Sequence, residues 1–120
     1  QTRQPVQERT DLTDAGVDVI GLGASTTYRA RDAAGASLLV DRLTAAQSLE
    51  TPGGNTWTVA DVPGSKCYTA TDTTTQGSTR GVAHCAVPVG RYVAEYSSPQ
   101  PAKTKQGIAA AYLILRTARG

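Results

Sequence analysis

The chain has 120 residues, of which 39% are hydrophobic and 18% charged, and this length and composition fit one globular domain with a modest core. The net charge of +2 comes from 12 basic and 10 acidic residues without a basic run, which argues against nucleic-acid binding. No segment approaches the ~20 apolar residues that cross a bilayer, so we expect membrane association only through an anchor or partner outside this chain.

Large apolar side chains are scarce, because Phe and Met are absent. Trp57, the five tyrosines and the Leu and Ile clusters must therefore supply much of the core. Cys67 and Cys85 are the only cysteines. The pair predicts a disulfide formed in an oxidising compartment, which would stabilise so light a core by ~3 kcal/mol. The alternative is two buried thiols in a cytosolic protein.

We interpret the chain as one domain, 1–120, in which residues 1–16 are a polar lead-in without helical or strand periodicity. Because the sequence starts with Gln1 rather than Met, we expect a processed form or a fragment, with any export signal or upstream domain outside it. A strand is predicted at about 26–30. Asp32 then caps a helix at about 33–47, whose apolar residues follow helical spacing.

The second half of the chain predicts strands and one helix. Alternating residues after Trp57 indicate a short strand. Strands near 66–71 and 80–87, joined by a Thr-rich loop, form a hairpin that places Cys67 opposite Cys85. In the next strand, "RYVAEY" places alternate side chains on opposite faces. A last helix is predicted to start near residue 104. Its apolar residues are spread over more than one side of the helix, which predicts burial on more than one side.

These elements predict an α+β two-layer sandwich in β-α-β-β-β-α order. An antiparallel sheet of about four strands is covered by two helices on one face, and one disulfide joins two strands. The other face of the sheet is left open, and this open face is where we expect function.

Three candidate sites carry chemistry. His84 beside Cys85 suggests a cysteine hydrolase or a metal site, but neighbours on a strand face opposite ways, and one His with two Cys leaves a zinc site incomplete. His84 is therefore interpreted as a surface residue.

"GLGAST" lacks the third glycine of a dinucleotide fingerprint, so no cofactor is predicted. Trp57, Arg91 and Tyr92 are candidates for a binding patch, with core anchoring as the alternative for the two aromatics.

Four stretches in order resemble a family of exported actinobacterial proteins, many of them mycobacterial-type lipoproteins, that carry a domain of unknown function. They are "TTYRARDAAGASLLVDRL", "KCYTA", "AHCAVPVGRYVAEY" and "KQGIAAAYLIL". The resemblance implies export, a cell-envelope setting and a C-terminal helix, and it implies no activity. The residues that carry it are Cys67, Cys85, Gly90, Arg91, Tyr92, Gln106, Ala110 and Tyr112. Those lipoproteins have an acylated N-terminal cysteine, which the given sequence does not contain, so we expect either a released fragment or an unlipidated relative.

We therefore expect an exported, extracytoplasmic module, in the cell envelope or secreted, without enzymatic activity. It binds a protein partner, associates with itself or serves as an accessory subunit of an envelope complex. The alternative is a small hydrolase that uses Cys67 or Cys85 with His84, or an envelope ligand-binding protein. No catalytic residue, cofactor or metal ligand is assigned.

Overall fold

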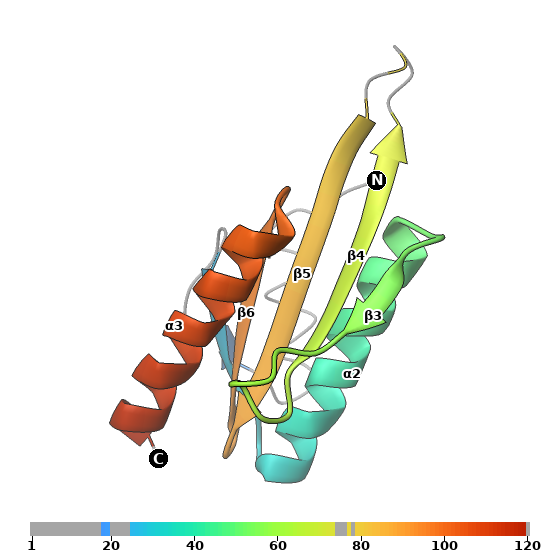
Figure 1. The fold of residues 1–120 in the computed structure, drawn as a ribbon. Coiled ribbons are helices and arrows are strands. Elements are labelled where there is room, and N and C mark those ends of the chain that lie inside the picture. The colour runs from blue at the N-terminus through green and yellow to red at the C-terminus, as the bar shows by residue number, and fades with distance from the viewer. Residues whose placement is uncertain (1–17, 20–24, 74–76, 78, 120) are drawn as a thin grey trace.

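The computed structural model in Figure 1 describes residues 18–19, 25–73, 77 and 79–119. The predicted lead-in and most of the Thr-rich loop lie outside these residues. The elements in chain order are β1 (Asp18–Val19), β2 (Ser25–Arg29), α2 (Ala33–Glu50), β3 (Asn55–Trp57), β4 (Lys66–Thr73), β5 (Thr79–Val89), β6 (Tyr92–Ser98) and α3 (Pro101–Arg119).

The strands form one antiparallel sheet in the order β1-β2-β6-β5-β4-β3. Strands β3 to β6 follow one another as a meander, whereas β2 pairs with β6 at the far side of the sheet. The chain therefore crosses the sheet through α2, which connects β2 to β3 (Figure 1). The described order is β-β-α-β-β-β-β-α. The predicted order lacks β1 and has three strands between the helices instead of four, although a strand segment was predicted for each of β3 to β6.

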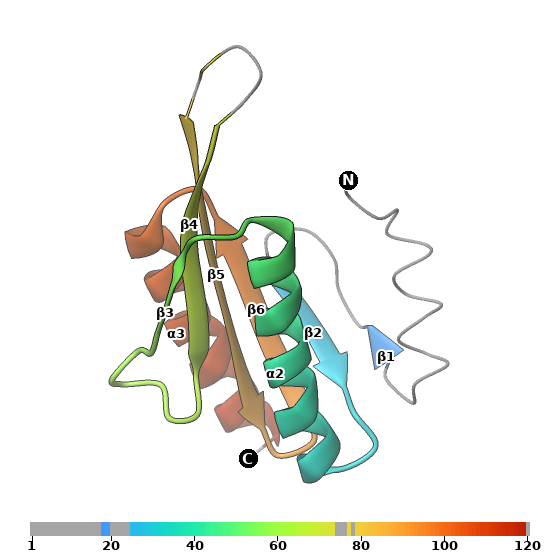
Figure 2. The ribbon, with the colours of Figure 1, turned by 90° about the vertical axis from the view of Figure 1, so that its right-hand side faces the viewer.

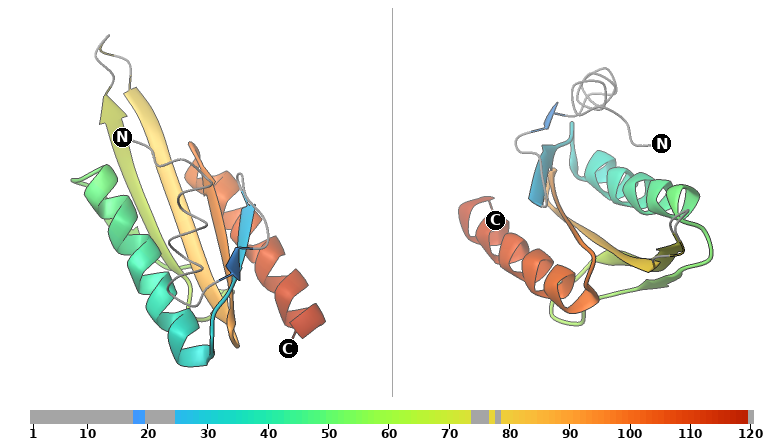
Figure 3. Two further views of the ribbon diagram at one scale, coloured as in Figure 1. Left: turned by 180° about the vertical axis from the view of Figure 1, so that it is seen from behind. Right: turned by 90° about the horizontal axis from the view of Figure 1, so that it is seen from above.

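The two helices lie on opposite faces of the sheet, so the prediction that both cover one face is wrong. Figure 2 shows α2 in front of the strands and α3 behind them, and the view from above in Figure 3 shows the sheet between the helices. The fold has three layers. The face that we expected to be open is covered, and a functional surface has to be sought on the outside of the helices or at the edges of the sheet.

Each face of the sheet packs its own apolar cluster under a helix. The cluster under α2 contains Tyr28, Ala30, Ala36, Leu39, Val40, Ala86 and Val93. The cluster under α3 contains Val59, Val62, Cys67, Cys85, Val87, Ala94, Ile108 and Leu115. Successive residues of β5 and β6 belong to different clusters, which confirms the predicted alternation in "RYVAEY". Two-sided burial requires small apolar residues on both faces of these strands, and the Ala-rich and Val-rich sequence supplies them.

Local signals in the sequence position the ends of several elements. Asp32 caps α2 as predicted, because its Oδ1 accepts a hydrogen bond of 2.7 Å from the backbone N–H of Gly35. Gly90 has a positive φ of 59° in the turn between β5 and β6, where Val89 pairs with Tyr92. This turn sets the register of the two central strands.

Helix α3 is buried along one side only. Ile108 and Leu115 face the sheet, but Leu113 is 57% exposed and Ile114 is 68% exposed. The prediction that this helix is buried on more than one side is therefore wrong for the described chain. Neither described helix is long and apolar enough to span a membrane.

Candidate functional site

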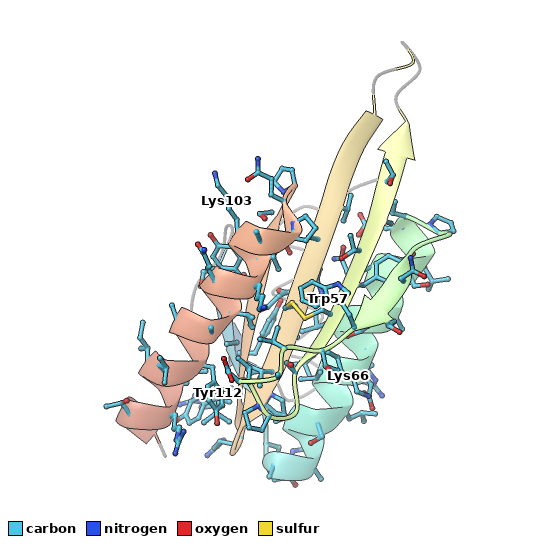
Figure 4. The ribbon with its side chains drawn as sticks, in the orientation of Figure 1. Trp57, Lys66, Lys103 and Tyr112 are labelled. Carbon is cyan, nitrogen blue, oxygen red and sulfur yellow. A yellow bond between two sulfur atoms is a disulfide. The ribbon has the colours of Figure 1, made fainter. Side chains whose placement is uncertain are left out.

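Cys67 and Cys85 are joined by a disulfide at the centre of the α3 face. They are paired directly across β4 and β5 with a Cα–Cα distance of 4.0 Å, as the predicted hairpin requires. Trp57 pairs with Cys67 from the β3 side, and Tyr96 pairs with Cys85 from the β6 side. Figure 4 shows Trp57 beside the disulfide. Both sulfurs are buried and oxidised, so neither can act as a thiolate nucleophile in this form.

His84 lies on the opposite face of the sheet from its neighbour Cys85. It is 0% exposed, so the interpretation of this histidine as a surface residue is wrong. His84 Nε2 lies 2.5 Å from Oε2 of Glu95, and the hydroxyl of Tyr28 donates a hydrogen bond of 2.6 Å to Oε1 of the same carboxylate. We call Tyr28, Glu95 and His84 the buried polar chain.

The strand register explains why these three side chains meet. Glu95 on β6 pairs with Ala86, two residues along β5 from His84, and β2 places Tyr28 on the same face. The Glu95 side chain is 14% exposed, whereas Tyr28 and His84 are closed off from solvent, so Glu95 is the member of the buried polar chain in contact with water. An imidazole with its proton on Nε2 donates to this carboxylate, which orients the ring and fixes the tautomer.

The second ring nitrogen of His84 is buried and has no hydrogen-bond partner among the described residues. A catalytic base needs a reachable proton to abstract, and His84 is closed off from solvent. In the part of the chain that the structure describes, no three His, Cys, Asp or Glu side chains gather closely enough to hold a metal ion. The geometry of the buried polar chain is that of a structural network within the core.

The three residues of the predicted binding patch do not form one continuous surface. Trp57 and Tyr92 are both half-buried on the α3 face, but two strands separate them. Along the strand direction, the positions of β5 that lie level with each of them are four residues apart. Standard sheet spacings then put them ~20 Å apart. Arg91 is exposed in the turn, where its Nε donates to the backbone carbonyl of Ala30. This hydrogen bond connects the turn between β5 and β6 to the segment just before α2.

The largest exposed apolar side chains at the C-terminal end of the fold lie on α3. Ala110, Leu113 and Ile114 are exposed and fall on one side of the helix at i, i+3 and i+4, and we call them the α3 outer stripe. Figure 4 shows Lys103 pointing away from the sheet near the start of the helix and Tyr112 on its inner side. The sequence contained this signal, because the apolar residues of α3 cover more of its circumference than one buried face needs.

The comparison with protein families assigns the chain to a family. Residues 1–118 match the family described as the C-terminal domain of unknown function DUF7373, and the chain belongs to this family. No curated protein and no solved structure matches it significantly.

Proposed function

We propose that this domain is an exported cell-envelope module that acts by docking, without catalysing a reaction. The family resemblance that suggests actinobacterial lipoproteins supports the location, and so does the disulfide, because such bonds persist in oxidising compartments. A protein partner, a second copy or a larger envelope complex are the occupants that the sequence predicts. The hydrolase alternative loses its nucleophile in the disulfide-bonded form, and its proposed base lies on the other face of the sheet.

The single observation that carries this proposal is the α3 outer stripe. A sequence that is apolar around most of a helix predicts burial, yet Leu113 and Ile114 are more than half exposed in the isolated domain. Two adjacent branched aliphatic side chains that stay in water contribute little to folding stability, and contact with another component of the envelope would gain the free energy of burying them.

Site-specific photocrosslinking in intact cells tests the docking proposal. A photoreactive residue at position 113 of the natural full-length protein should give a discrete adduct after irradiation. The same residue at position 49 is the matched control, because Leu49 is 83% exposed on α2 at the opposite side of the sheet. Equal labelling from both positions would mean that α3 has no specific occupant, and the proposal would be wrong.

Export has a separate test in the same cells. Acid quenching followed by thiol alkylation should leave Cys67 and Cys85 unmodified until a reductant is added. Alkylation of both cysteines without reduction would place the domain in a reducing compartment and refute the extracytoplasmic setting.

A further inference from the structure

Every charged residue in helix α3 is basic. Its sequence, PAKTKQGIAAAYLILRTAR, contains Lys103, Lys105, Arg116 and Arg119 and has no Asp or Glu. The side chains of Lys103, Lys105 and Arg116 are exposed. The docking surface of the proposed function is therefore apolar in its middle and positively charged at both ends.

The positions of these residues follow from helical geometry. At ~100° per residue, Lys103, Ala110 and Ile114 lie within ~40° of one line along the helix, and Leu113 borders them. Lys103 precedes the α3 outer stripe by about two turns. Arg116 follows Leu113 within one turn, ~60° around the helix from it on the side away from Ile114, and Lys105 lies on that same side. Long basic side chains at these positions can reach phosphate groups while the aliphatic side chains between them enter an apolar layer.

We propose that α3 lies on an anionic lipid surface. Leu113 and Ile114 enter the boundary between headgroups and acyl chains, and Lys103 and Arg116, which lie at opposite ends and flanks of the stripe, contact lipid phosphates. A basic amphipathic helix that lies in the interface plane has this combination of faces. The inference rests on the proposed docking function, but it replaces the protein occupants named there with a lipid surface. It also departs from the expectation that only an anchor or partner outside this chain brings the domain to a membrane.

Three features of the helix favour lipid over protein. The stripe contains Ala, Leu and Ile without Trp, Tyr or Arg at its centre, whereas those residues carry most binding energy between proteins. Two large apolar side chains are few for the core of a specific protein interface, which typically covers ~800 Å² on each partner. A second copy docked through the same helix would place basic residues against basic residues, which disfavours self-association through α3.

Vesicle flotation of the oxidised full chain tests the inference. The probes are vesicles of equal parts phosphatidylglycerol and phosphatidylcholine, and vesicles of phosphatidylcholine alone. We expect binding to the anionic vesicles to be at least about tenfold stronger and to weaken as salt is raised. The variant Leu113→Gln/Ile114→Gln should bind at least about tenfold more weakly, because it removes the inserted side chains.

The matched control is Leu38→Gln/Leu49→Gln, which changes two exposed leucines on α2. This control should bind the anionic vesicles as the unchanged chain does, within about twofold. Circular dichroism of both variants shows whether the fold is retained, and all four substituted side chains are at least half exposed.

Each result decides the inference. Equal binding to neutral vesicles, no binding at all, or unchanged binding by the α3 variant would overturn it. A discrete protein adduct from position 113 in cells, together with no vesicle binding, would leave the docking function standing and refute the lipid occupant. Failure of both experiments would refute both proposals.

Discussion

Replacing Glu95 should destabilise the domain strongly, because this carboxylate joins the buried polar chain. Glu95→Leu removes the acceptor for Tyr28 and leaves both nitrogens of buried His84 without a partner among the described residues. Losing one partner of a buried ionisable pair costs about 3–5 kcal/mol. The 14% exposure of Glu95 lets water reach the site, so we expect a loss of about 3 kcal/mol in the free energy of unfolding.

A double-mutant cycle measured by urea denaturation isolates the contribution of the pair. His84→Phe keeps a ring in the same space and should cost about 2 kcal/mol, because Glu95 retains Tyr28 as a donor. With both residues replaced by apolar ones, the loss should be smaller than the sum of the single losses by at least about 1 kcal/mol. Glu50→Leu is the control, since Glu50 is exposed at the end of α2 and its loss should change stability by less than about 0.5 kcal/mol.

Single losses that add within about 0.5 kcal/mol would show that Glu95 and His84 do not interact in solution. A Glu95→Leu variant as stable as the Glu50→Leu control would refute the reasoning from burial altogether.

Three further substitutions test the framework of the fold by urea denaturation. Replacing Cys67 and Cys85 together with Ala should lower the free energy of unfolding by about 3 kcal/mol, since their sequence separation is 18; a loss below about 1 kcal/mol would contradict this. Asp32→Ala should cost about 1 kcal/mol by removing the N-cap of α2, whereas Asp32→Asn should cost much less. Gly107→Ala should destabilise the domain although Ala favours helices, because the new Cβ would lie 2.5 Å from the Tyr96 ring; increased stability would show that the ring moves freely.

Local features of the fold were predictable from the sequence. Asp32 before helically spaced apolar residues predicted the start of α2, and the alternation around Val93 predicted the two faces of β6. The pairing of Cys67 with Cys85 followed from two strands joined by a loop of turn-forming composition. Each of these depends on residues near one another in the sequence.

The arrangement of layers was not predicted, because it depends on contacts between distant segments. Adjacent small apolar residues, such as Ala86 and Val87, contained the signal, since both faces of their strand are buried. The burial of His84 depends on Glu95 and Tyr28, which reach it only through the pairing of β2 with β6. A single sequence does not specify which distant strands will become neighbours.

The position of β2 beside β6 also has a consequence for the order of folding. The meander β3 to β6 closes through short connections, whereas Thr27 of β2 pairs with Ala94 of β6, after the chain has passed through α2 and three strands. Closing this loop costs conformational entropy, and the contacts between β2 and β6 that offset this cost can form only after β6 has joined the meander. We therefore expect β2 to dock late. In stopped-flow experiments Tyr28→Leu should then mainly accelerate unfolding, and Val87→Ala in β5 should mainly slow folding. A high φ-value at Tyr28 would instead place β2 in the folding nucleus.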